Sequence, residues 1–188
     1  MTLEFTVDPE LTEGLQAEIV ACWTDVTNAG GSVGFVPPVT MDDVLPVAAK
    51  SLAAVAAGYD RLVIGREIAG NGGNTADGTG DLASGRLAAL AFMTSEQSQL
   101  TEHWRNVKKV MVHPDFQGRG FGAALLAEAE DVARDWGLAG LRLTCRGGLG
   151  LERFYERCGY KEVGRIPGVI RVAPGDDRDE VVMWLELR

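Results

Sequence analysis

The chain has 188 residues, of which 46% are hydrophobic, and 27 Asp/Glu against 18 Lys/Arg give it a net charge of −9. This length fits a single domain, residues 1–188, that can bury a substantial core, and the composition excludes a disordered chain. The acidic balance argues against nucleic-acid binding, which depends on neutralising phosphates, and mildly favours a cationic substrate such as an amine.

Targeting, metal and disulfide signals are lacking in the sequence. It has no run of 18 apolar residues and no basic, apolar leader at its start, so we expect a cytoplasmic protein that does not contact membranes. Its three cysteines, Cys22, Cys145 and Cys158, are far apart and without C-x-x-C spacing, and it has only two histidines. We therefore expect reduced thiols and no metal site.

The first third of the chain predicts a strand and two helices. Residues 3–7 alternate apolar and polar side chains, and Asp8-Pro9 is a typical start for the helix whose apolar face runs from Leu11 to Val26. An apolar, proline-rich loop follows at residues 32–38, which we expect near a cleft. Thr40 then caps a second helix that ends near Ala57, although Pro46 predicts a later first turn.

The remaining elements predict a sheet. Buried strands are expected at residues 61–67 and 86–93, on either side of a glycine-rich segment, residues 69–81, that we interpret as a mobile hairpin tip. Further elements are a strand ending at Val112, a helix ending at Trp136, a strand at 141–145, a short helix at 151–158, and two closing strands at 161–172 and 180–187. The order predicts an α/β fold with a mixed, mostly antiparallel sheet of about seven strands and about four helices.

The stretch from Val107 to Trp136 carries the strongest functional signal. A strand leads into glycines at 118, 120 and 122, and these open an amphipathic helix. The first N–H groups of a helix have no intrahelical partner and lie at the positive end of the helix dipole, so this construction binds anions such as phosphates. The G-x-G-x-G spacing differs from the dinucleotide-binding and P-loop motifs, which makes a nucleotide-binding protein the weaker alternative.

Residues 117–122, QGRGFG, instead fit the pyrophosphate loop Q/R-x-x-G-x-G/A, and the stretch resembles the GNAT superfamily of acyl-CoA-dependent N-acyltransferases. The resemblance implies acetyl-CoA as acyl donor. The residues that it assigns to cofactor binding are Val110, Met111, Val112, Gln117, Gly118, Arg119, Gly120, Phe121, Gly122 and Ala123, with the pyrophosphate held from Gln117 to Ala123. Val110 to Val112 would pair with the pantetheine, and the Val112 N–H would hold the developing oxyanion.

A second similarity lies in residues 151–160, LERFYERCGY, which match the family helix that carries a catalytic tyrosine. The resemblance gives Tyr155 the role of the acid that protonates the leaving thiolate, whereas Phe154 and Tyr160 are expected to be core aromatics. The chain departs from the family at Gly148 and Leu151, where many members have asparagine and a small residue. A narrower resemblance, to the tabtoxin-resistance-type antibiotic acetyltransferases, lies in residues 32–38 and in His103 followed by Val107, Lys109 and Val112-His113-Pro114.

The general base and the acceptor are less well defined. Where narrower relatives carry acids, this chain has Asn106 and Thr144, so His103 is the chosen candidate base, with Glu102, His113 and ordered water as alternatives. We expect Phe35 and Val36 to bind the acceptor, a primary amine of a small molecule, which leaves antibiotic or toxin amines, polyamines, amino acids and protein N-termini open. A non-catalytic acyl-CoA sensor is the alternative function, and a homodimer is one option for the assembly.

Overall fold

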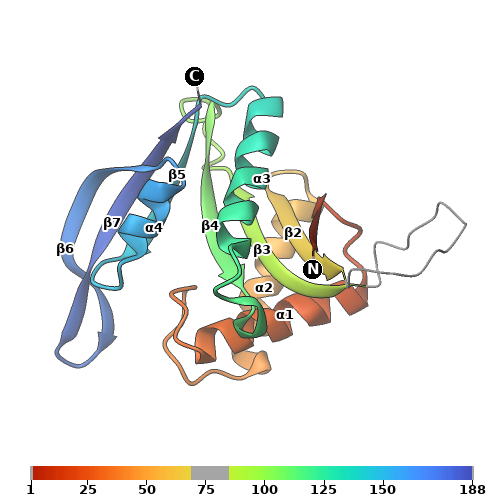
Figure 1. The fold of residues 1–188 in the computed structure, drawn as a ribbon, viewed down its shortest axis with the longest axis horizontal. Helices are drawn as coiled ribbons and strands as arrows, with labels where there is room; N and C mark the ends of the chain where they lie inside the picture. The colour runs from red at the N-terminus through yellow and green to blue at the C-terminus, as the bar shows by residue number, and fades with distance from the viewer. Residues whose placement is uncertain (1, 69–84, 188) are drawn as a thin grey trace, which may run out of the picture.

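The computed structural model describes residues 2–68 and 85–187. Within these ranges seven strands form one sheet in the order β1-β2-β3-β4-β5-β7-β6, and four α-helices pack on it (Figure 1). The strands are β1 (Thr2–Val7), β2 (Arg61–Ile68), β3 (Arg86–Thr94), β4 (Trp104–Val112), β5 (Gly140–Arg146), β6 (Lys161–Ala173) and β7 (Asp176–Glu186). Only β4 and β5 pair in parallel, so the predicted mixed, mostly antiparallel α/β fold is confirmed.

The helices cover both faces of the sheet. Helices α1 (Glu13–Asn28) and α2 (Met41–Ala56) pack on one face, whose core includes Trp23, Leu62 and Phe92. Helices α3 (Phe121–Asp135) and α4 (Leu151–Arg157) cover the other face. Because the central strands are buried on both faces, β3 is an almost continuous run of buried residues, as expected for the middle of such a sheet.

Two details of the first helices differ from the prediction. Helix α1 begins after Thr12, whose hydroxyl accepts from the Leu15 N–H, and not at Asp8. Asp8 instead accepts hydrogen bonds from the Leu62 N–H at 2.9 Å and from Arg61 at 2.6 Å, so a tertiary contact uses the side chain that the sequence offers as a cap.

In α2 the first turn is present despite Pro46. The hydroxyl of Thr40 accepts from the Asp43 N–H, and the Asp43 carboxylate accepts from the Thr40 N–H at 2.8 Å. This capping box satisfies two N–H groups at the helix start, and the proline removes only one later hydrogen bond on the exposed side.

The other predicted elements agree with the structure to within a few residues. The last strand is the exception in length, since β7 begins at Asp176, directly after a turn at Pro174-Gly175. The predicted hairpin tip, residues 69–81, lies outside the described residues. No helix in the described part of the chain is both long and apolar enough to cross a membrane.

Candidate active site

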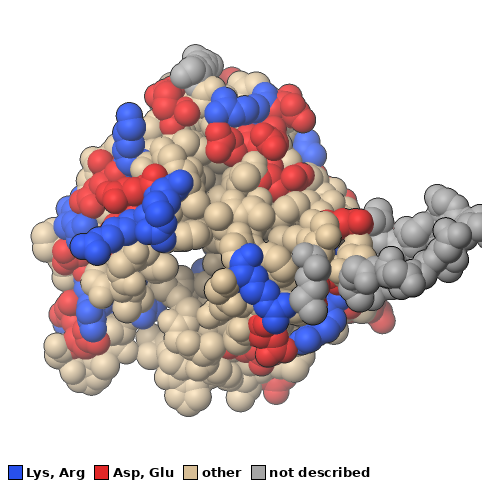
Figure 2. Space-filling model, in the orientation of Figure 1, with Lys and Arg blue, Asp and Glu red and all other residues tan. Residues whose placement is uncertain are grey.

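Strands β4 and β5 diverge and leave a cleft in the middle of the sheet. They pair only where Trp104 to Asn106 face Gly140 to Arg142, although β4 continues to Val112 and β5 to Arg146. Lys109 has a positive φ of 55°, and the pairing of β4 with β3 is irregular beside it. A cavity of about 380 Å³ fills the gap between the strands, and Figure 2 shows a hollow between the α3 side and the side of α4, β6 and β7.

The two faces of the cleft differ in chemistry because side chains alternate along β5. Leu141, Leu143 and Cys145 are buried on the side of α3 and α4, where Tyr155 also lines the cavity. Arg142, Thr144 and Arg146 are less buried and project towards the other face. The cleft therefore has an apolar half beside α4 and a polar half on the opposite side of the sheet.

Tyr155 belongs to the apolar half. Helix α4 starts after Gly150, which has a φ of 73°, and its only buried residue is Tyr155. Burial raises the pKa of Tyr155 well above its ordinary value of 10, so the phenol keeps its proton at neutral pH. None of the described residues hydrogen-bonds its hydroxyl, which leaves the hydroxyl available to a ligand in the cavity.

Tyr160 is the neighbouring aromatic residue, with its ring 6.0 Å from that of Tyr155. Its hydroxyl is buried and has no hydrogen-bond partner among the described residues, and Tyr160 does not line the cavity. Tyr160 is thus a core residue, as its position in the sequence suggested, and it provides a matched comparison for Tyr155.

The glycine loop forms an uncapped helix start. Gly118 and Gly120 have φ values of 75° and 81°, which side-chain-bearing residues rarely adopt, and α3 begins at Phe121 without a side-chain cap. A Cβ on Gly122 would lie 3.2 Å from Phe154 and 3.6 Å from Val112. The turn therefore requires Gly118 and Gly120 for their conformation, whereas Gly122 permits close packing against Phe154 of α4 and the end of β4.

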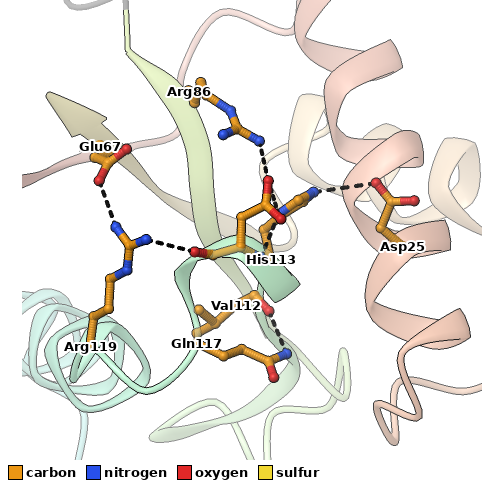
Figure 3. Close-up of polar contacts among 8 residues, drawn as sticks. Asp25, Glu67, Arg86, Val112, His113, Gln117 and Arg119 are labelled. Atoms are coloured by element: carbon orange, nitrogen blue, oxygen red, sulfur yellow. Dashed lines mark hydrogen bonds and ion pairs between the residues drawn. The ribbon is translucent and has the colours of Figure 1, made fainter. Parts of the chain in front are cut away.

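Arg119 of the same loop interacts with protein groups in this structure. Its guanidinium contacts Glu67 at 3.0 Å and the Asp115 carbonyl at 2.9 Å (Figure 3), and it lies over the ring of Phe116 at 5.3 Å. Asp115 also accepts from Arg86 at 2.7 Å, and these contacts lower the pKa of its carboxyl. The contacts of Arg119 hold the glycine loop against β2 and against the turn at Asp115 and Phe116.

The end of β4 presents backbone groups towards the cleft. The His113 N–H donates to the Ala88 carbonyl of β3 at 2.9 Å. Since successive peptide groups point to opposite edges of a strand, the Val112 N–H is directed away from β3, towards the edge that β5 has left. The Gln117 side chain donates to the Val112 carbonyl at 3.1 Å (Figure 3). Val110 lines the cavity and Met111 is fully buried in the core.

A carboxylate that the sequence analysis did not single out lies at the closed end of the cleft. Glu96, in the loop before β4, accepts a hydrogen bond from the Asn106 side chain at 2.5 Å, and Arg142 donates to the Asn106 oxygen at 3.4 Å. Asn106 is only 4% exposed, and all three residues line the cavity. A carboxylate is therefore held beside Asn106, although the strand position itself is uncharged.

The two histidines lie elsewhere. His103 is exposed and lies just before β4, next to Trp104, which pairs with Gly140 of β5. Val112 is at the opposite end of β4. His113 interacts with Asp25 at 3.3 Å and accepts from the Asp115 N–H at 3.2 Å (Figure 3). Neither histidine lines the cavity, so the structure does not bring His103 or His113 together with Tyr155.

The loop before α2 contributes other residues than those predicted. Ser32 and Gly34 line the cavity, whereas Phe35 packs edge-on against Trp23 at 6.1 Å and Val36 is 51% exposed. The loop is close to the cleft, as expected, but Phe35 and Val36 do not border the cavity. Hydrophobicity indicated the loop, whereas its backbone turn at Gly34, with a φ of 101°, determines which residues face inward.

The cysteines do not form a catalytic centre. Burial raises the pKa of Cys145 to about 11 and that of Cys22 to about 12, so both thiols are protonated and poorly nucleophilic at neutral pH. All three cysteines are free thiols. Over residues 2–68 and 85–187, no group of three or more His, Cys, Asp and Glu side chains is arranged to hold a metal ion.

Comparison with known proteins places this geometry in context. Residues 77–160 match the model of the acetyltransferase (GNAT) family. Similar solved structures include a candidate phosphinothricin N-acetyltransferase, with 19% identity over 100% of this chain and 99% of that one and a TM-score of 0.73. Another is yncA of Salmonella typhimurium with its cofactor acetyl-CoA, with 18% identity, coverage of 100% and 94%, and a TM-score of 0.70. A third is a chimera of Vibrio cholerae spermidine N-acetyltransferase SpeG and hSSAT, with 16% identity, coverage of 100% and 96%, and a TM-score of 0.70.

Proposed function

We propose that the protein transfers the acetyl group of acetyl-CoA directly to a primary amine of a small molecule, because residues 77–160 match the model of the GNAT acetyltransferase family and the chain has the fold of solved GNAT structures. One observation carries the proposal. The divergence of β4 and β5 brings Tyr155, the exposed edge of β4 at Val110 and the carboxylate of Glu96 to one cavity, and β4 continues from there to Val112, ahead of the uncapped start of α3.

The residues present fit acetyl-CoA. A diphosphate accepts hydrogen bonds from backbone N–H groups, and the turn from Gly118 to Gly122 presents such groups at the positive end of α3. At Gly118 and Gly120 a Cβ would meet no protein atom within 4 Å, so their α-carbons border open space that a ligand can approach. The open edge from Val110 to Val112 suits the amide groups of pantetheine, which can pair as an additional strand does.

Three residues would perform the chemistry. Acetyl-CoA supplies an acyl carbon that an unprotonated amine attacks. Glu96 accepts the proton that the amine loses, since its carboxylate lines the cavity and is held by Asn106. The Val112 N–H donates to the oxygen on which negative charge develops. Tyr155 gives its proton to the departing sulfur, so that the products are the N-acetyl amine and free CoA thiol.

Glu96 takes the place of His103 in this proposal. A base must lie within hydrogen-bonding distance of the proton that it removes, or be connected to it by one water molecule. His103 does not line the cavity and therefore does not meet this requirement. Arg119 would position the glycine loop through its contact with Glu67, and Gln117 through its hydrogen bond to the Val112 carbonyl. The backbone N–H groups of the loop would bind the diphosphate itself.

Two matched variants test the proposal. Glu96→Gln keeps an oxygen that can accept from Asn106 but removes the basicity, so we expect kcat to fall by about 10²–10⁴ while acetyl-CoA affinity is retained. Glu102→Gln changes an exposed glutamate of the same segment that does not line the cavity, and it should leave kcat unchanged. Calorimetric titration of acetyl-CoA and release of CoA thiol with a panel of amines are the measurements.

The panel also decides between an enzyme and a non-catalytic acyl-CoA sensor. Tight binding of acetyl-CoA without thiol release for any amine would refute the proposed catalysis and support the sensor. Failure of acetyl-CoA to bind would refute both.

A further inference from the structure

The polar half of the cleft is rich in unpaired positive charge. Four cationic residues line the cavity, Lys108, Lys109, Arg142 and Arg146, against two carboxylates, Glu96 and Glu180. Within the described ranges none of the four cations lies within 4 Å of a carboxylate, whereas eight other arginines form such ion pairs. Although the chain has a net charge of −9, four cations at this cavity have no carboxylate partner among the described residues.

Arg146 gives the clearest sign of a missing partner. Its Nε is buried and has no hydrogen-bond acceptor among the described residues. Glu180 is its register neighbour on β7, yet the two side chains do not form an ion pair. The Nε of Arg105 is also unpartnered, but its Nη1 donates to two carbonyl groups and its guanidinium faces Trp136, outside the cavity. A buried donor without an acceptor is destabilising, which favours an anionic ligand at Arg146.

Lys109 approaches the same half of the cleft from β4. Its positive φ turns the side chain towards α1, where the ammonium lies 5.2 Å from the centre of the Trp23 ring. The place is tight, because a Cβ on Gly34 would come within 2.3 Å of the Lys109 nitrogen. Lys109 is thus held over the cavity by Trp23 and Gly34, facing the polar side where Arg142 and Arg146 project from β5.

We propose that the acceptor is an amine that also carries a carboxylate, as a free amino acid does, and that Arg146 with Lys109 binds the carboxylate while Glu96 receives the amine. This proposal rests on the proposed acetyl transfer and names its substrate class. Arg142 is bonded to Asn106 and is therefore left to hold Glu96 in place. Four cations disfavour a polyamine, so the cationic substrate expected from the overall acidity is narrowed to an amine that also carries a carboxylate.

Matched acceptors test the proposal directly. The 20 free amino acids, the amide of each and the corresponding decarboxylated amines differ in the carboxylate, and CoA thiol release gives kcat/KM for each. A charge-assisted contact to the carboxylate predicts that the preferred amino acid exceeds its own amide by at least about tenfold, mainly through a lower KM. Spermidine should be a poorer acceptor than this amino acid.

Variants identify the residue responsible. Arg146→Gln should raise the KM for the amino acid about tenfold or more, leave the KM for its amide within about threefold, and retain acetyl-CoA affinity. Arg146→Lys should restore part of the preference because it keeps the charge. Arg157→Gln removes an arginine outside the cavity and should change neither KM.

The outcomes separate this proposal from acetyl transfer itself. Equal or better turnover of amides, decarboxylated amines or spermidine would overturn the carboxylate proposal and leave the acetyltransferase intact. A preference for the acid that survives in Arg146→Gln would overturn the assignment to Arg146. Binding of acetyl-CoA without turnover of any acceptor would overturn both.

Discussion

Replacing Tyr155 by Phe tests the acid step while preserving the packing. The change removes only the hydroxyl, which has no hydrogen-bond partner among the described residues, and keeps the ring that packs 5.1 Å from Phe154. If the phenol protonates the departing thiolate, kcat should fall by about 10²–10⁴. At about 1.36 kcal/mol per decade, this is a loss of about 2.7–5.4 kcal/mol of transition-state stabilisation.

Tyr160→Phe is the matched control, because it removes a hydroxyl from the same aromatic cluster outside the cavity. The Tyr160 hydroxyl is buried and unpartnered, and such a group destabilises the folded state by about 1–3 kcal/mol. The control should therefore be fully active and more stable, with a Tm about 2–4 °C higher for each kcal/mol gained.

The assay for both variants is CoA thiol release in steady state and in single turnovers, with acetyl-CoA affinity measured by titration. The pH profile adds an independent check. Since burial raises the pKa of Tyr155, the acid stays protonated, and wild-type kcat should not decline below pH 10 through loss of this proton. A Tyr155→Phe variant with kcat within tenfold of wild type in single turnovers would remove Tyr155 from the mechanism.

Two further predictions concern the glycine loop and the partly buried Lys109. Gly120→Ala places a Cβ at a φ of 81° with no neighbour within 4 Å, so we expect only a conformational strain of about 1–2 kcal/mol, and acetyl-CoA affinity should fall about tenfold. The control Gly164→Ala, in open space on β6, should leave acetyl-CoA affinity unchanged. Burial, together with the charge of Lys108, lowers the pKa of Lys109 in the folded protein below its ordinary value of 10.5. Between the folded and the unfolded pKa of this lysine, the unfolded chain binds more protons than the folded one, so the free energy of unfolding rises with pH in that window. Denaturation at pH 7 to 10 should show the stability of Lys109→Met relative to wild type decreasing as pH rises, and a constant difference would contradict this reasoning.

Several properties stay predictions from the sequence. These are the single domain over residues 1–188, the cytoplasmic location, the absence of nucleic-acid and membrane partners, the option of a homodimer, and every assigned site residue. The structure shows where the assigned site residues lie. Tyr155 and Val110 border the cavity, whereas His103, Phe35 and Val36 do not.

Local chemistry in the sequence determined the elements and the glycine turn before α3. The predicted glycine turn before a helix is present, with Gly118 and Gly120 at positive φ, and the apolar periodicity of residues 121–135 indicated the buried face of α3. Such signals can be read from sequence because each depends on neighbours within a few residues, through helix hydrogen bonds, capping and side-chain alternation.

Only the tertiary structure determined the polar half of the cleft. Glu96 lies in a polar loop without a motif, and its contact with Asn106 depends on how that loop packs against β4, while Arg142 and Arg146 come from a strand more than thirty residues further on. Their shared position follows from where β4 and β5 stop pairing, which depends on the bulge at Lys109 and on the antiparallel pairing of β5 with β7. Composition indicated an acidic chain, but long-range strand pairing placed four cations without a carboxylate partner in the described part of the chain in one cavity, and no local pattern encodes that arrangement.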